Sequence, residues 1–324
     1  MTSMYASSSR FASLCLIAAG VAASVAQAAA PAEIHIPGER VFPESLTSTA
    51  DGSVIIGSIA AGTIYRTKPG SDTAEPWIPP GTDGLQGVFG VFADEKSKTL
   101  WACSGTFGPP APGAAPKPSA LHAFDLKSGA PKGNYPVPTA GGGCNDIAIG
   151  SDGAAYVTDT SNMQVLRLKK GAKALEVWAG AGAFGPKGGV LDGISVLKNR
   201  VLVNALLTSK LFSVPIGKDG KAGAVTEVKL DRALERPDGM RRFGKNALLV
   251  VEGGAGGRLS RIVLDGDSGK VTSLKEGFPG GPVSVTVVGD TGYVLEGQLG
   301  MFMRPTPGAQ PQPFHAVAVP VGKP

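Results

Sequence analysis

A pattern of strand, turn, strand, loop and strand recurs six times along the chain, and this repeat constrains the fold more than any other feature. Its clearest copy is Asn145–Asp159, where Ile147 and Ile149 alternate with other residues before a Ser-Asp-Gly turn. The unit starts are spaced 44, 57, 47, 46 and 46 residues apart, at Glu44, Val88, Asn145, Asp192, Asp238 and Ser284. Such units bury their apolar faces only by packing around an axis, so we predict an all-β, six-bladed β-propeller with four-stranded antiparallel blades.

The composition agrees with many short strands joined by tight turns. The chain has 47 Gly and 26 Pro, and 18% of its residues are charged. We expect one propeller domain over residues 29–324, and a proline-rich surface loop at 108–118 accounts for the single long spacing. The segment Glu33–Pro37 is expected to close the ring against the last blade, and a weaker last strand is expected near Met301–Arg304.

The first 28 residues have the features of a cleaved secretory signal peptide. Arg10 precedes an apolar run over Phe11–Val25, and small residues follow at the expected cleavage site near Ala28. The run is short for a membrane span, so we expect an exported protein, periplasmic or secreted, with no span retained. Cleavage leaves Cys103 and Cys144, which form either one disulfide or two buried thiols.

The charge pattern argues against a nucleic-acid partner. The formal net charge is +5, and the basic residues are scattered without interleaved aromatic residues. We therefore expect a monomer with a generally basic surface that takes a small molecule as its partner.

Four oxygen-bearing side chains occupy equivalent unit starts: Glu44, Asn145, Asp192 and Asp238. The first strand of each blade lines the central channel, so these residues should meet at one end of it. Three carboxylates there would raise one another's pKa unless a cation neutralised them. Oxygen ligands favour Ca²⁺, with Mg²⁺, Mn²⁺ or Zn²⁺ as alternatives. In the competing interpretation, Asp before Gly simply forms turns, which leaves Glu44 unexplained.

Other polar residues are weaker candidates. His35, His122 and His315 are isolated and out of register with the channel. Asp159 and Glu252 follow second strands, where they are either neighbours of the channel site or solvated charges. Hydrolase elbows, phosphate-binding loops and zinc-protease helices are absent from the sequence.

Several short motifs together carry a family resemblance. They are Pro43-Glu44, Asn145-Asp-Ile147, Tyr156-Val-Thr-Asp159, Asp192-Gly-Ile194 and Pro237-Asp-Gly-Met240. In this combination the chain resembles the senescence marker protein and gluconolactonase family, also called the regucalcin-like family, over nearly all of the expected mature protein. Members of that family are six-bladed propellers that hold a divalent ion in the channel mouth and hydrolyse lactones.

The resemblance implies roles for individual residues. Glu44 and Asp238 match metal ligands, Asn145 matches an asparagine near the ion, and Asp192 stands where the family has a liganding asparagine. Gly143 stands where the sugar lactonases have an arginine that grips substrate. The implied activity is hydrolysis of a lactone or related ester, with Asp238 as the base that activates water and Asn145 donating to substrate or completing the metal shell.

Two other function classes stay open from the sequence. One is a non-catalytic propeller that binds a protein, peptide or glycan partner, because propellers serve both purposes. The other is a lyase or a strictosidine-synthase-like condensing enzyme on the same fold.

Overall fold

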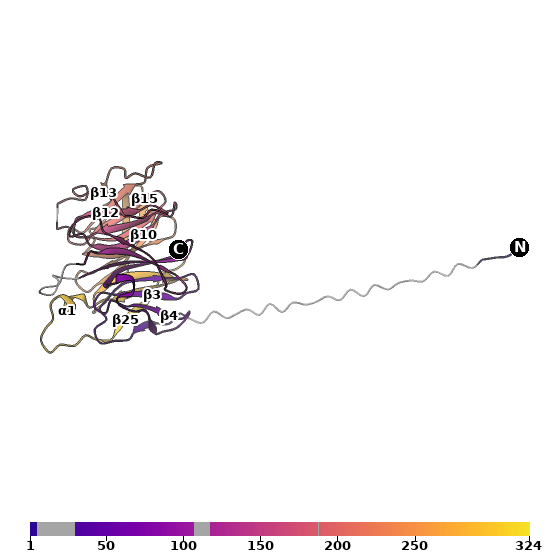
Figure 1. Cartoon of the computed structure of the whole chain (residues 1–324), viewed down its shortest axis with the longest axis horizontal. Helices are drawn as coiled ribbons and strands as arrows, with labels where there is room; N and C mark the ends of the chain where they lie inside the picture. Colours follow the sequence, from indigo (N-terminus) through magenta and orange to yellow (C-terminus); the bar gives the residue numbers. More distant parts are fainter. Residues whose placement is uncertain (5–29, 107–116, 187) are drawn as a thin grey trace.

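Short strands joined by tight turns pair into six antiparallel sheets arranged as the blades of a propeller (Figure 1). The computed structural model describes residues 1–4, 30–106, 117–186 and 188–324. The predicted signal peptide over residues 1–28 lies, apart from residues 1–4, outside this described part, and so does most of the predicted loop at 108–118. Among the described residues, no helix is long and apolar enough to cross a membrane.

Each blade runs outwards from an inner strand at the channel, and the chain fills the blades in order. The strands, blade by blade and from the channel outwards, are β2 (Pro43–Ser48), β3 (Val54–Ser58), β4 (Ile64–Thr67) and β5 (Ala74–Ile78); β6 (Gly87–Asp94), β7 (Thr99–Gly105), β8 (Ala120–Asp125) and β9 (Pro131–Pro136); β10 (Cys144–Ile149), β11 (Ala155–Asp159), β12 (Gln164–Leu168) and β13 (Glu176–Ala179); β14 (Leu191–Leu197), β15 (Arg200–Ala205), β16 (Lys210–Pro215) and β17 (Thr226–Glu227); β19 (Pro237–Phe243), β20 (Ala247–Glu252), β21 (Arg258–Asp265) and β22 (Ser268–Glu276), with the short β18 (Lys229–Leu230) parallel to β22; and β23 (Pro282–Val288), β24 (Thr291–Glu296), β25 (Phe314–Pro320) and β1 (Glu33–Ile36). The 3₁₀ turn η1 (Thr82–Gly84) and the helix α1 (Leu299–Met303) complete the assigned elements.

The N-terminal strand closes the ring, as predicted from Glu33–Pro37. Strand β1 pairs with β25 as the outermost strand of blade 6, and the inner strands contact one another in a closed circle. The strand predicted near Met301–Arg304 is wrong, because this segment forms α1. The ring centroid of Phe302 in α1 lies 5.1 Å from that of Phe42. The apolar side chains of α1 therefore cover the contact between blades 6 and 1, and this segment does not extend a sheet. The third strand of blade 6 is β25.

The hydrophobic core consists of six clusters, one between each pair of adjacent blades. Ile55 of blade 1 packs with Val91 of blade 2, for example, and Leu46 of blade 1 packs with Leu295 and Phe314 of blade 6. Because each cluster draws on two blades, a single blade has no complete core of its own. This arrangement explains why the sequence needs the repeat.

All six inner strands contain a β-bulge near their first residue, where the inner strand has one residue more than its partner. Glu44, Asn145, Asp192 and Asp238 lie at this bulge, so their predicted equivalence holds. The positions assigned to blades 2 and 6 are wrong by one residue: the bulges place Phe89 and Val283 in register with Glu44, in place of Val88 and Ser284.

The glycines that follow the channel aspartates are required by close packing between blades. A Cβ atom on Gly193 would collide with the carbonyl oxygen of Asp238, and one on Gly239 would lie 2.8 Å from the Cα atom of Ser284. Both Asp-Gly pairs lie inside inner strands, so the interpretation of Asp192 and Asp238 as simple turn residues is wrong.

A disulfide joins Cys103 of β7 to Cys144 of β10, with Cα atoms 5.1 Å apart, so the two cysteines are not free thiols. Replacing both by alanine is expected to lower the free energy of unfolding by about 2–4 kcal/mol, because the bond closes a loop between residues 41 positions apart. Urea unfolding with and without reductant measures this. Reductant should not affect the double variant, and an unchanged wild-type midpoint in reductant would contradict the expectation.

Candidate metal centre

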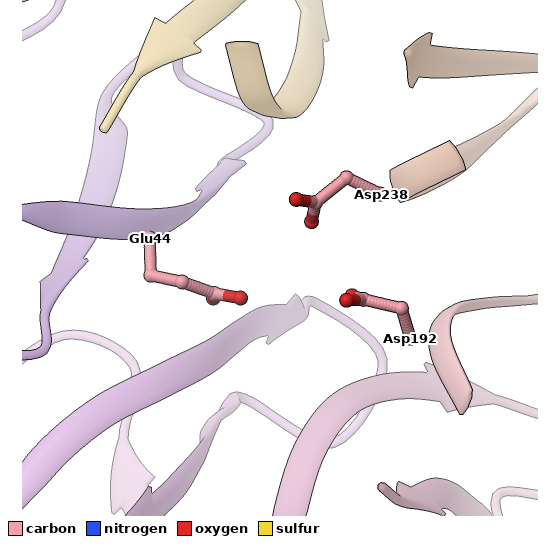
Figure 2. A group of neighbouring side chains, drawn as sticks. All are labelled: Glu44, Asp192 and Asp238. Atoms are coloured by element: carbon pink, nitrogen blue, oxygen red, sulfur yellow. The ribbon is translucent and has the colours of Figure 1, made fainter. Parts of the chain in front are cut away.

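Three carboxylates meet at one end of the channel. Glu44, Asp192 and Asp238 each offer an oxygen, and these atoms all lie within 4.8 Å of one another. Figure 2 shows the three side chains pointing toward a common centre from three different blades. The bulges place them there, because an extra residue in a strand redirects its side chain out of the regular alternation. The sequence-predicted cluster is therefore brought together in space.

Asn145 lies beside this triad. Its Nδ2 donates a hydrogen bond of 3.0 Å to Oδ1 of Asp192. The bulge of Asp192 is also held through its backbone, because its carbonyl oxygen accepts a bond of 2.8 Å from the Thr158 hydroxyl. In this geometry Asn145 orients Asp192, and its amide keeps a second N–H and the carbonyl oxygen for other partners.

The triad is electrostatically costly when every member is ionised. Burial, followed by the charge of Asp146, raises the pKa of Asp192 to about 7. Burial also raises the pKa values of Glu44 and Asp238 well above their usual range, with the charge of Asp192 as the next cause for both. Protons or a cation must therefore compensate these side chains at neutral pH.

A buried ion pair lies next to the triad, and sequence reasoning missed it. Arg241 of β19 donates to Asp146 of β10 at 2.8 Å and reaches Ser45 Oγ at 3.3 Å and the carbonyl oxygen of Val91 at 3.3 Å. One side chain from blade 5 thus spans the channel to blades 1, 2 and 3. Its positive charge lowers the pKa of Glu44, although burial and the neighbouring carboxylates outweigh this effect.

Asp159 and Glu252 are fully buried, so they are not solvated charges. Each ends a second strand opposite the residue that precedes a channel side chain. Asp159 accepts a bond of 2.9 Å from the backbone N–H of Gly143, and Glu252 accepts bonds from Arg232 at 2.7 and 2.9 Å. They brace the loops that lead into Asn145 and Asp238, and they lie outside the triad.

None of the three histidines belongs to the triad, as expected from their register. His122 is buried in blade 2, where its ring stacks on Phe124 at 6.0 Å between centroids. Burial lowers the pKa of His122, so it is neutral at physiological pH. His35 and His315 lie on blade 6. Ser284, one residue from the bulge, also stays outside the triad, and its buried hydroxyl has no hydrogen-bond partner within the described chain.

A cavity of about 840 Å³ opens beside Asn145. Its described walls come from blades 2 and 3 and include Phe89, Val137, Asn145 and the Gly141–Gly143 turn, with Lys117 as the charged side chain among them. A Cβ atom on Gly143 would closely meet only the rotatable hydroxyl of Ser161, at 2.9 Å, so the position has room for a side chain that this sequence does not supply. The cavity is therefore mostly uncharged and next to the triad.

The donor set fits a hard divalent cation. Three carboxylates and an adjacent amide supply oxygen atoms only, which is the preference of Ca²⁺ and Mg²⁺. The local charge also fits, because four carboxylates, counting Asp146, face one guanidinium. The three carboxylates that the sequence placed in register do converge, and their role as metal ligands stays a prediction, whereas the histidines and cysteines lie elsewhere.

Without metal, the protein is expected to become less stable as pH rises from about 5 to about 8. The folded pKa of Asp192, about 7, exceeds its unfolded value, so the folded state binds more protons between the two. This contribution to the free energy of unfolding is fully present below about pH 4 and is lost as pH rises through about 7. The loss is roughly 1 kcal/mol per pH unit for each such carboxylate. Urea unfolding in chelator across this range tests the sign, and excess Ca²⁺ should reverse it. A chelated protein that gains stability toward pH 8 would contradict the expectation.

Known structures share this fold. A luciferin-regenerating enzyme is similar with a TM-score of 0.62 and 11% identity, covering 88% of this chain and 94% of that one. A candidate gluconolactonase is similar with a TM-score of 0.60 and 15% identity, covering 91% and 96%. A catalytically inactive virginiamycin B lyase from Staphylococcus aureus, solved with quinupristin, is similar with a TM-score of 0.55 and 15% identity, covering 89% and 98%.

At these identities the likeness establishes the propeller fold and nothing about the reaction. No family model matches the chain, and no curated protein matches it in sequence.

Proposed function

We propose that the protein is an exported, metal-dependent hydrolase that opens a lactone or a related ester at the mouth of the propeller channel. The observation that carries this proposal is the convergence of Glu44, Asp192 and Asp238 within 4.8 Å at one end of the channel. Carboxylates with pKa values raised by burial and by neighbouring charges, gathered beside a cavity, are candidates for a functional site.

The three carboxylates would hold the ion, which in our proposal is Ca²⁺, with Mg²⁺, Mn²⁺ or Zn²⁺ as alternatives. When bound, such an ion supplies a Lewis acid that polarises the ester carbonyl. Burial does not separate Asp238 from Glu44, because Asp238 is half-buried and Glu44 is 9% exposed, and the proposed choice of Asp238 rests on the resemblance to the lactonase family. We assign to Asp238 the removal of a proton from the water that attacks the carbonyl carbon.

Asn145 borders both the carboxylate triad and the cavity beside it. One of its amide hydrogens is committed to Asp192, and the other is available to an oxygen of a substrate in the adjacent cavity. The described walls are mostly uncharged and combine Phe89 and Val137 with hydroxyl groups, which come from Thr106, Ser119, Thr139, Thr160 and Ser161, so they suit an uncharged substrate with both apolar and polar groups. Gly143 supplies no charged side chain there to grip a substrate.

Export to the periplasm or the exterior belongs to the proposal. The disulfide between Cys103 and Cys144 supports it, because such bonds persist in oxidising compartments. The shared fold of the candidate gluconolactonase is compatible with lactone hydrolysis, and that of the lyases with an elimination. The product distinguishes these reactions, because hydrolysis adds one water to the lactone whereas elimination leaves the mass unchanged.

The test is metal analysis of purified residues 29–324, followed by a panel of lactones and aryl esters with and without chelator. We expect a tightly bound divalent ion that Asp238→Asn removes, and turnover that chelator abolishes. If no divalent ion binds, the site is wrong. If the ion binds without turnover, the ion is structural and a propeller that binds a protein, peptide or glycan becomes the better interpretation.

A further inference from the structure

A second cavity, of about 810 Å³, lies on the outer part of blade 6. One wall is built by α1 and the segment after it, and another by the turn at Gly280 and Gly281. Figure 1 shows α1 next to β25, the strand that contributes His315 to the cavity. The lining does not include Glu44, Asp192 or Asp238, so this cavity is separate from the channel site.

The centre of this cavity is a hydrogen-bonded histidine and carboxylate. Glu296 is buried, its Oε1 accepts the backbone N–H of Gly280 at 2.7 Å, and its Oε2 lies 2.7 Å from Nε2 of His315. An ionised carboxylate only accepts, so Nε2 of His315 carries the hydrogen. The lone pair of the neutral ring is therefore on Nδ1, which is the atom left to bind a ligand.

A second histidine faces the first across the sheet. In the antiparallel pair of β1 and β25, His35 is directly opposite His315, and Glu33 is two residues away on the same face. Opposed residues have Cβ atoms about 4.5–5.5 Å apart. Unlike the channel triad, these side chains do not hold their ligand atoms within 4.8 Å of one another as they stand. His35 is exposed, however, and within the described chain its ring makes no hydrogen bond, so side-chain rotation alone can bring it toward His315. Glu33, His35, Glu296 and His315 all line the cavity.

The carboxylates at the equivalent positions of blades 3 and 5 already have all their hydrogen-bond partners within the protein. Asp159 in blade 3 is saturated by backbone and amide donors, and Glu252 in blade 5 is saturated by Arg232 and Ser260. In blade 6 the same position pairs with an imidazole that opens onto a cavity. The carboxylates of blades 3 and 5 thus brace their loops without a histidine, so this structural role does not explain the histidine in blade 6.

We propose that this face of blade 6 is a second metal site, for a transition-metal ion of the Zn²⁺ type. His315 Nδ1 and His35 are the nitrogen ligands, and Glu33 supplies a carboxylate. Glu296 positions the ring of His315, because a liganding histidine commonly donates its other N–H to a carboxylate. Two imidazoles and a carboxylate suit Zn²⁺, whereas the oxygen-only triad in the channel suits harder ions.

The test is the titration of ¹⁵N-histidine-labelled protein without a polyhistidine tag with Zn²⁺, followed by NMR of the ring nitrogens. Zinc in the channel is invisible to this readout, because none of the three histidines belongs to the triad. We expect the rings of His35 and His315 to shift at stoichiometric zinc, with the His315 change on Nδ1. The ring of His122, buried in blade 2, is the internal control and should not move.

Two variants separate ligand from positioning roles. His35→Ala changes an exposed side chain, and it should lower the zinc affinity of this site at least about tenfold and remove the shift of His315 at stoichiometric zinc. Glu296→Gln should lower zinc affinity by about 10–100-fold while both rings still shift at saturation. The proposal is overturned if only one ring responds to zinc, if neither does, or if His35→Ala leaves the His315 response unchanged.

Discussion

Asp238→Asn is expected to abolish tight divalent-ion binding and to lower kcat/KM for the best lactone or ester by at least about 10²–10⁴-fold. The substitution keeps the size of the side chain and an oxygen atom, but it removes the negative charge of a metal ligand and the proposed proton acceptor. It also removes one of three mutually repelling carboxylates, so the metal-free variant should be more stable than metal-free wild type at neutral pH. Isothermal titration with Ca²⁺, steady-state kinetics and urea unfolding in chelator measure the three effects.

The opposite signs of the activity and stability changes make this experiment specific. A variant that merely misfolded would lose both. Asp290→Asn is a matched control, because Asp290 is exposed in the turn between β23 and β24, at the other end of the inner strand from the bulge. It should change neither metal binding nor metal-free stability. An Asp238→Asn protein that keeps wild-type affinity for the ion would rule out the triad as the metal centre.

The sequence predicted the blades and the triad because both follow from local periodicity. Strand alternation and the near-constant spacing place Glu44, Asp192 and Asp238 at the same height in their blades. The error at Val88 and Ser284 has a local cause. Each inner strand has one bulged residue, and the spacing between units does not reveal which residue it is.

Contacts across the ring could not be predicted from periodicity. Arg241 and Asp146 are 95 residues apart, and only closure of the propeller brings their side chains together. An arginine in an inner strand was the available signal, because such strands are otherwise mostly apolar or small. His315 looked isolated in the sequence for a similar reason. Its partner Glu296 is 19 residues away, and part of the segment between them forms α1, where a strand was expected.

Arg241→Met is expected to destabilise the protein by about 3–5 kcal/mol, because it leaves Asp146 as an uncompensated buried charge beside the triad. Asp146→Asn combined with Arg241→Met should recover part of that loss, since the double variant has no unpaired charge of the pair. Urea unfolding of the wild type, both single variants and the double variant gives the coupling energy as a double-mutant cycle.

The metal dependence of this cycle links the ion pair to the proposed metal centre. If Arg241 offsets the negative charge of the channel, a bound divalent ion should take over part of this role, so saturating Ca²⁺ should reduce the cost of Arg241→Met. The guanidinium also repels the ion, and we therefore expect Arg241→Met to bind Ca²⁺ more tightly than the wild type, provided that it remains folded. Weaker Ca²⁺ binding by a folded Arg241→Met protein would instead assign Arg241 the role of holding the bulges in place through Ser45 and Asp146.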